Sequence, residues 1–512
     1  MAGIKNRFRL GLALTCAIQM PAFANDPLSA IEWLEKRPKQ IVVPLETPRI
    51  AIDEPAVAGS VTTPEVTVTP LGAPVRAAAG LLPSNVTGLP RDLWQGSDAK
   101  VASTLITALN SEKLPALQAL LFTLLLAEAG PPSDAQASEF LRARLQKLLS
   151  FGALDPAAAL LMRADPAHPD LFDLYFDVSL LSGDPDAPCK ALKAQPSLSR
   201  DFAPRIFCDV QLKDWDNAAL TLSTADAIGA LEPTDVALLE RFLDPELFEQ
   251  TPPAPQSLSV LQFRLFEAAG ESLPTTSLPR AFAATDLSGD AGWKPQLYAA
   301  ERLARVGSIS ENRLLGIYTS RIPSASGGIW DRIEAVQRLD IALKSGDPVD
   351  ILKQLRRSWE KMKEVQLEVP FATLFAQDLL LLPSQGADAD LITKIALLSP
   401  IYEQAAERGT EDVTLIMAQS IAIGEPKAQS ALPLSQTLTD SFSGAGAPQT
   451  LTDMAGNARL GEAILRAIAL TMSGAEGDPA ALQNGLAFLR SIGLEDTVRR
   501  AAIQLILLEQ GL

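Results

Sequence analysis

The cysteines set the first limits on the chemistry of this chain. Besides Cys16, which lies in an apolar N-terminal run, only Cys189 and Cys208 are present. Helices predicted at 185–195 and 202–212 place each cysteine six residues from the intervening loop, so antiparallel packing brings the two level. In an oxidising compartment such a pair favours a disulfide over two free thiols, and the lack of Cys-x-x-Cys disfavours a redox role. We therefore predict a structural disulfide.

The single histidine, His168, excludes most metal and triad chemistry. Zinc and copper sites of the usual kind need several imidazole or thiolate ligands, and a Ser-His-Asp triad would depend on this one residue. No Gly-x-Ser-x-Gly elbow, phosphate loop or Rossmann fingerprint accompanies it. We expect His168 to lie in a turn between helices, and we assign no metal site and no cofactor.

Two further patterns could carry catalysis. Ser358 and Lys361 have the Ser-x-x-Lys spacing of penicillin-binding proteins, in which the lysine takes the serine proton, but no Ser-Asp-Asn or Lys-Thr-Gly occurs. Glu271-Ser272 and the glycine-rich segment 444–449 resemble parts of a soluble lytic transglycosylase motif, but about 170 residues separate them, whereas one pocket needs both. We assign no catalytic residue and expect a protein that is not an enzyme.

The first 24 residues have the three-part pattern of a secretory signal peptide. A basic start containing Lys5, Arg7 and Arg9 precedes an apolar run and small residues that end at Ala24. We predict cleavage after Ala24 and export to the periplasm. Without this segment 41 basic residues face 61 acidic ones, a net charge of about −20, which disfavours nucleic acid and anionic lipid as partners. The apolar run 114–129 is too short to span a bilayer, so no transmembrane span is expected after signal removal.

A short helix on a long linker is predicted next. Residues 25–38 form an amphipathic helix in which Leu28, Ile31 and Leu34 share a face with Trp33 beside them. Frequent prolines make 39–96 an extended or disordered linker. Three roles stay open for the helix: docking on the rest of the chain, on a partner, or at a membrane surface.

The remainder is predicted to be all-α. Four aspartates (Asp155, Asp184, Asp214, Asp244) recur at intervals of 29, 30 and 30 residues, and as N-caps they would mark successive helical hairpins. We expect an αα-hairpin superhelix over 97–424, a Gly/Ser/Pro-rich loop over 425–453 and a C-terminal helical segment over 454–512. Individual helices include one predicted from Leu391 to Glu407.

Parts of this pattern resemble tetratricopeptide repeats. The stretches 207–222 and 343–355 are similar to the junction between two such repeats, although the period is near 30 rather than 34. The layout of 26–33 and 317–330 is also similar to that of secreted helical proteins of proteobacteria. The resemblance implies a TPR-like solenoid with a long contact surface.

Two classes of function follow from this reasoning. The first is a non-catalytic periplasmic scaffold or assembly factor for cell-envelope proteins, which binds a protein or peptide of unknown identity. The second is a peptidoglycan-acting envelope enzyme with a carboxylate site that the sequence does not locate. A deep cleft with two carboxylates within about 10 Å would favour the enzyme, and a continuous groove would favour the scaffold. The oligomeric state stays unknown.

Overall fold

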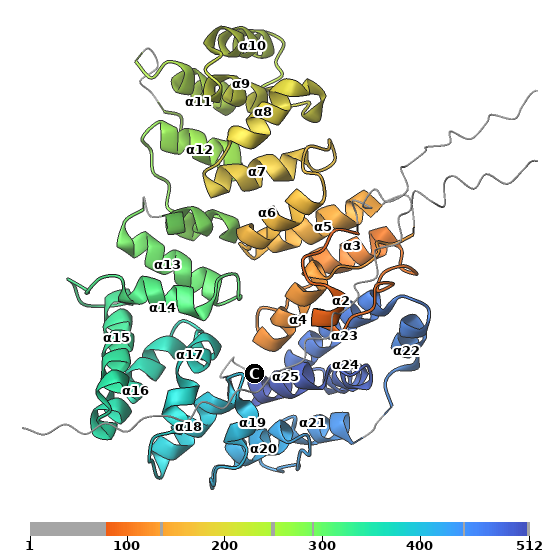
Figure 1. Cartoon of the computed structure of the whole chain (residues 1–512), viewed down its shortest axis with the longest axis vertical. Helices are drawn as coiled ribbons and strands as arrows, with labels where there is room; N and C mark the ends of the chain where they lie inside the picture. The colour runs from red at the N-terminus through yellow and green to blue at the C-terminus, as the bar shows by residue number, and fades with distance from the viewer. Residues whose placement is uncertain (1–77, 134–136, 247–250, 289–290, 444–445, 509–512) are drawn as a thin grey trace, which may run out of the picture. The chain divides into compact units, whose positions relative to one another are not determined.

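The computed structural model describes residues 78–133, 137–246, 251–288, 291–443 and 446–508. These residues form helices joined by turns, and within these ranges the only β-pairing is an isolated bridge between Leu82 and Ala127 (Figure 1). The predicted all-α class is therefore confirmed. None of the helices in these ranges has both the length and the apolar content needed to cross a bilayer. The predicted signal peptide 1–24 and helix 25–38 lie outside the described residues.

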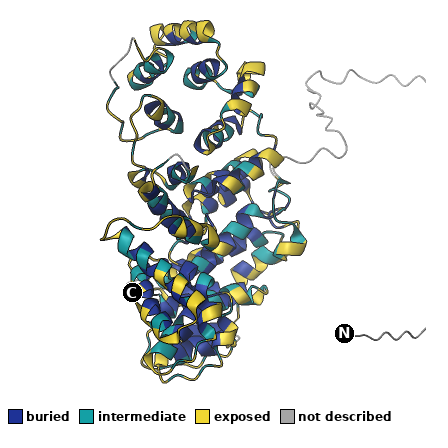
Figure 2. Cartoon of the chain, turned by 60° about the vertical axis from the view of Figure 1, so that its left-hand side comes forward, coloured by how far each residue is buried: buried dark blue, intermediate teal, exposed yellow. Residues whose placement is uncertain are grey.

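The helices form two groups around two apolar cores, and α7 and α12 contribute buried residues to both cores. The first group, the α7–α12 module, contains α7 (Phe172–Ser182), α8 (Asp186–Ala194), η2 (Pro196–Leu198), α9 (Phe202–Gln211), α10 (Trp215–Ala227), α11 (Pro233–Leu243) and α12 (Val260–Ala268). The second group, the body, contains α2 (Ser84–Thr87), α3 (Ala99–Ala108), α4 (Pro115–Leu126), α5 (Ala137–Ser150), α6 (Leu154–Arg163), η3 (Thr275–Ser277), η4 (Arg280–Ser288), α13 (Trp293–Ala304), α14 (Glu311–Thr319), α15 (Ile329–Ser345), α16 (Pro348–Lys363), α17 (Glu368–Leu380), α18 (Ala387–Leu397), α19 (Tyr402–Ala405), α20 (Val413–Ala422), α21 (Ser435–Phe442), α22 (Gln449–Gly456), α23 (Leu460–Ala475), α24 (Pro479–Ser491) and α25 (Glu495–Leu507). Buried residues run along the helices of both groups, and exposed residues occupy the opposite faces (Figure 2).

Gly-Asp-Pro turns create the tightest hairpins. Gly346 ends α15 with a φ of 76°, Asp347 caps α16 by accepting a hydrogen bond from a first-turn N–H, and Pro348 begins that helix. Asp478 caps α24 in the same way. Both turns are short, so α15 packs on α16 and α23 packs on α24. At these two positions the proline of Gly-Asp-Pro is the first residue of a helix.

The four regularly spaced aspartates do not share one role. Asp214 is the N-cap residue of α10, but Asp155 is the second residue of α6 and Asp184 lies two residues before α8. Asp244 follows the last residue of α11, whose first residue is Pro233. The predicted common N-cap role is wrong because packing of apolar faces, rather than the aspartate, sets where these helices begin.

The predicted linker over 39–96 is corrected at its C-terminal end. Residues from 78 onward are ordered: they include α2 and the bridge at Leu82, and the side chains of Leu93 and Trp94 are fully buried. Trp94 packs against Phe140 of α5, with ring centroids 5.0 Å apart. Prolines exclude long helices here, but they do not stop short turns from packing on a core.

Two other predicted boundaries also change. The helix predicted from Leu391 to Glu407 is broken into α18 and α19, because Pro400 has no N–H and its ring clashes with the preceding turn. The predicted loop 425–453 contains α21 and most of α22, in which Leu438 and Leu451 are buried. Polar composition alone therefore does not identify a loop.

Helices from the two ends of the body pack against each other, α4 on α25 and α3 on α23 (Figure 1). Gln504 of α25 accepts a hydrogen bond at 2.8 Å from the N–H of Ala116 in the first turn of α4. The N–H of Gly461 in α23 donates to the carbonyl of Leu93 at 2.9 Å, and a Cβ on Gly461 would lie 2.5 Å from the Trp94 ring. A stack in which each hairpin contacts only its neighbours lacks such contacts.

Buried charges in the body have partners. Arg332 forms two hydrogen bonds with Glu301, at 2.7 and 2.8 Å, and Tyr318 donates to the same carboxylate at 2.7 Å. The Glu462 side chain is fully buried and pairs with Arg459 and Arg466. Burial alone raises the pKa of Glu462. The hydrogen bonds and charges of the two arginines have the larger combined effect, so the pKa lies below its usual range.

Candidate functional site

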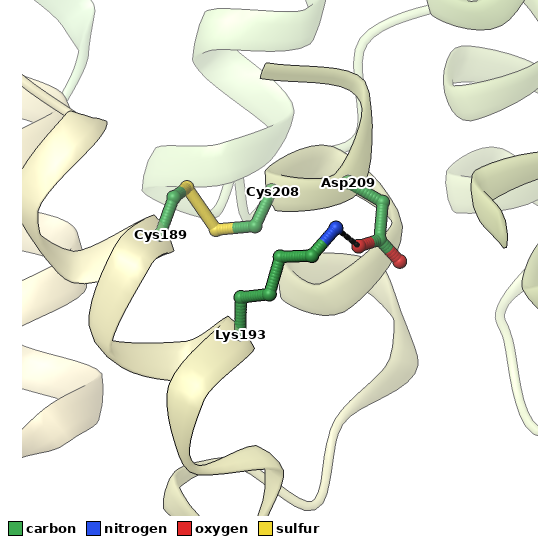
Figure 3. The surroundings of a disulfide bond; sticks show 4 residues. All are labelled: Cys189, Lys193, Cys208 and Asp209. Carbon is green, nitrogen blue, oxygen red and sulfur yellow. Dashed lines mark ion pairs between the residues drawn. A yellow bond between two sulfur atoms is a disulfide. The ribbon is translucent and has the colours of Figure 1, made fainter. Parts of the chain in front are cut away.

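The predicted disulfide is present and joins α8 to α9 (Figure 3). The Cys189 and Cys208 sulfur atoms lie 2.04 Å apart, the Cα atoms lie 4.9 Å apart, and both side chains are buried in the core of the α7–α12 module. A crosslink closing a loop of about this length stabilises a fold by about 3 kcal/mol in the chain-entropy model. The disulfide therefore holds α9 firmly against α8.

One side of this hairpin bears a cavity of about 500 Å³ between α8, α9 and α10, here called the disulfide-side cavity. Lys193 Nζ lies 3.8 Å from a carboxylate oxygen of Asp209 and also pairs with Asp214. The ion pair with Asp209 is marked in Figure 3. Asn217 donates a hydrogen bond to Asp209 as well. Burial raises the pKa of Asp209, although Lys193 acts in the opposite direction. The charged groups of this cavity thus already have partners within the chain.

The other side of α9 borders a second cavity of about 570 Å³, here called the acidic cavity. Its walls come from α7, the first turn of α9 with the residues before it, the turn between α10 and α11, and the first turns of α11 and α12. The charged residues that line it are Asp173, Asp177, Arg200, Asp201, Glu232 and Asp235, and the aromatic ones are Phe172, Phe176 and Phe202. Carboxylates therefore outnumber cations five to one.

Asp177 differs from the other acids of this cavity. Its side chain is partly buried, and no described residue donates a hydrogen bond to it or forms an ion pair with it. Burial, together with repulsion from Asp173, raises the pKa of Asp177 to about 7. Its carboxyl group therefore changes charge near neutral pH.

Two of the neighbouring acids have partners. Asp173, one turn from Asp177 on α7, accepts two hydrogen bonds of 2.6 Å from Arg142 of α5. Burial raises the pKa of Asp173, but the hydrogen bonds and charge of Arg142 lower it overall. Asp235 accepts a hydrogen bond at 2.8 Å from Gln262 of α12. An ionised and a titrating carboxylate thus lie one turn apart, and Asp177 has capacity for a ligand.

Helix α9 links the two cavities to the disulfide. Phe202, at its first residue, lines both cavities, and Cys208 lines the disulfide-side cavity six positions later. Because the disulfide fixes α9 to α8, it also fixes Phe202 and the preceding Asp201 at the edge of the acidic cavity. The acidic cavity can hold a cationic group, or a group with an apolar part and a cationic part, and it needs no metal ion to do so.

The other sequence candidates do not form a reactive centre. His168 lies in the turn before α7, as predicted, and its Nδ1 accepts a hydrogen bond from the Asp170 N–H at 3.2 Å. The Ser358 hydroxyl is buried and donates to the carbonyl of Gln354 at 2.8 Å, while Lys361 pairs with a glutamate. In the part of the chain that the structure describes, no group of three or more His, Cys, Asp or Glu side chains could hold a metal ion.

The predicted docking helix cannot be placed, because Leu28, Ile31, Trp33 and Leu34 lie outside the described residues, as does the predicted cleavage position after Ala24. The acidic cavity was not predicted from the sequence. One feature of the sequence pointed to this cavity: Asp177 stands in an apolar run from Leu171 to Leu181. In the structure the residues that flank it on several faces of α7 are buried.

Comparison with known proteins gives no relative for this chain. No protein-family model matches it, and no curated protein or solved structure matches it either.

Proposed function

We propose that this chain is a non-catalytic periplasmic scaffold or assembly factor that binds cell-envelope proteins, with the acidic cavity as a contact site for a partner segment. The observation that carries this proposal is the cavity itself: about 570 Å³, with aromatic residues in its walls, an excess of carboxylates, and one partly buried carboxylate, that of Asp177, without a partner in the described chain. A binding site of this size suits side chains of a polypeptide, and its charge suits a basic one.

Two features support the location and the architecture. The disulfide is the kind of crosslink found in oxidising compartments, in agreement with export after cleavage of residues 1–24. Within the α7–α12 module, α8 to α12 each pack on the next helix along the chain, which is the order of a TPR-like superhelix. We include both the periplasmic location and the TPR-like arrangement of this module in the proposal.

Site-specific photo-crosslinking in intact cells tests the proposal. A photoreactive residue replaces Ala203, which lines the acidic cavity, and in the control it replaces Ile341, an exposed residue of α15 in the body. We expect a crosslink to an envelope protein from position 203 and none to that protein from position 341. The same protein crosslinked from both positions, or no crosslink from position 203, would contradict the proposed site.

The alternative function, a peptidoglycan-acting enzyme, has one specific observation in its favour. Asp177, whose carboxyl group titrates near pH 7, and the ionised Asp173 lie one turn apart in the same cavity, and acid chemistry uses such pairs of unlike carboxyl groups. Incubation of the purified protein with peptidoglycan sacculi decides between the two functions. Release of soluble fragments that is abolished by D177N would favour the enzyme, and no release would favour the scaffold.

A further inference from the structure

We propose that the acidic cavity binds the side chain of a lysine or arginine in a basic peptide segment, with the carboxylate of Asp177 as its ionic partner. This inference rests on the proposed function, because it names the chemistry of the segment that the scaffold would contact. It adds a ligand class and a residue role that the scaffold proposal alone does not specify.

The first argument is the unsatisfied charge. A partly buried carboxylate without a hydrogen bond or ion pair is unfavourable, and a ligand cation would provide the missing partner. Of the neighbouring acids, Asp173 is paired with Arg142 and Asp235 accepts from Gln262, while Asp201 and Glu232 are exposed to solvent. Arg200, the one cation that lines the cavity, is exposed and does not pair with Asp177.

The second argument is the aromatic surface beside that carboxylate. Phe202, at the start of α9, is partly exposed and lines the cavity with Asp177. The almost fully buried rings of Phe172 and Phe176, which stack with centroids 6.2 Å apart, also border the cavity. Long cationic side chains bury their methylene groups on such surfaces while the charged end reaches a carboxylate or a ring face. A small inorganic cation would make no use of the aromatic wall, so the cavity favours an organic cation.

The third argument is charge complementarity over the whole cavity. Carboxylates reach it from α7 (Asp173, Asp177), from the residue before α9 (Asp201) and from the start of α11 (Glu232, Asp235), and only Arg200 opposes them. A single cationic side chain at Asp177 would lie within this field, and adjacent basic residues of the same segment would lie near the outer acids. We therefore commit to a peptide rather than to a free amine.

Titration of Asp177 makes the binding dependent on pH. With a pKa of about 7, its carboxylate is mostly protonated at pH 6 and mostly ionised at pH 8. Asp173, held by Arg142, stays ionised over this interval and contributes a constant attraction. We expect the affinity for a basic peptide to rise about tenfold from pH 6 to pH 8.

The test measures binding of a fluorescein-labelled hexalysine peptide to the full-length protein by anisotropy. At pH 8 we expect D177N to weaken binding about tenfold, whereas the matched variant D216N, which removes an exposed carboxylate of α10 outside the cavity, changes it less than about twofold. At pH 6 the D177N and wild-type proteins should bind alike, because Asp177 is then neutral in the wild type.

Several outcomes would overturn the inference. The first is equal binding by D177N and wild type at pH 8, and the second is an equal loss of affinity in D177N and D216N. The third is no rise in wild-type affinity from pH 6 to pH 8, a measurement that needs no variant. Tighter binding of spermidine than of hexalysine would reject the peptide. If position 203 crosslinks a partner in cells and D177N does not reduce that crosslink, the scaffold proposal stands and this inference fails.

Discussion

The body and the α7–α12 module stabilise their helices in different ways. In the body, residues far apart in sequence close the structure, as Gln504 does with Ala116, and buried charges such as Glu301 are fully paired. In the module, packing is mostly between successive helices, a disulfide adds a covalent link, and two cavities border α9. The buried carboxylates Glu301 and Glu462 of the body are paired within the chain, whereas the partly buried carboxylate of Asp177 in the module has no partner in the described residues.

This difference indicates where binding is expected. A buried carboxylate that accepts hydrogen bonds from arginines, such as Glu462, has no capacity left for a ligand. A partly buried carboxylate that lacks a partner, such as Asp177, destabilises the folded state until a ligand or a proton neutralises it. The contrast between Glu462 and Asp177 is therefore a contrast between an acid paired within the fold and an acid that is available to a ligand.

The largest expected effect comes from breaking a buried ion pair of the body. Arg332→Met leaves Glu301, whose side chain is only 5% exposed, with Tyr318 as its remaining partner. We expect the free energy of unfolding to fall by about 3–5 kcal/mol in urea denaturation. Arg338→Met on the same helix is the control: it removes an exposed pair with Glu334 and should cost no more than about 1 kcal/mol. Equal losses would mean that the body does not depend on buried charge.

The disulfide provides the second test, in the module. The double variant C189S/C208S should lower the stability of the α7–α12 module by about 3 kcal/mol, because the unfolded chain regains the entropy of the open loop. Hydrogen exchange followed by mass spectrometry should show faster exchange in α8, α9 and α10 and little change in α23 and α25. Faster exchange throughout the body would contradict the separation of the two groups.

A smaller effect should follow from crowding the contact between the two ends of the body. The Cβ of Gly461→Ala would lie 2.5 Å from the Trp94 ring, so α23 must shift from the segment before α3, and we expect a loss of about 1–3 kcal/mol. Gly316→Ala in α14 is the control, because its Cβ meets no atom within 4 Å and alanine favours a helix interior. The control should gain about 0.5–1 kcal/mol, so the two variants differ in sign. Thermal denaturation measures both, and a gain for Gly461→Ala would show that the contact is loose.

Local patterns predict the helices and the disulfide, but not the contacts between distant parts of the chain. Gly346 and Asp347 define a hairpin because a turn is a local event. Trp94 falls within the predicted linker because Gly461, which it contacts, lies far along the chain, and no local pattern reveals that pairing.

The acidic cavity illustrates the same limit. Phe202, Asp177 and Asp235 come from three helices, and only folding brings them to one cavity. The sequence does show that Asp177 interrupts an apolar run, which marks it as unusual. Its lack of a partner depends on where every neighbouring side chain lies, so it cannot be read from the sequence.

A gain in stability on removing the Asp177 charge tests whether Asp177 is unsatisfied in the free protein. Its pKa is raised from 3.8 to about 7 on folding, so the folded state binds the proton more tightly than the unfolded state does. Stability should therefore be greatest below the unfolded pKa and fall as pH rises toward and through 7. The full shift corresponds to about 4 kcal/mol, and solvent access to this partly exposed group reduces it to about 2 kcal/mol.

In the absence of a ligand, Asp177→Asn should thus raise the midpoint of urea denaturation at pH 8 and leave it nearly unchanged at pH 4. Asp173→Asn is the matched comparison one turn away, and it should lower the midpoint of urea denaturation at pH 8. It removes the ion pair with Arg142, which contributes above pH 4 and is lost as pH falls through the lowered pKa of Asp173. If both variants destabilise at pH 8, Asp177 has a partner in solution, and the contrast between the satisfied acids of the body and the available acid of the module fails.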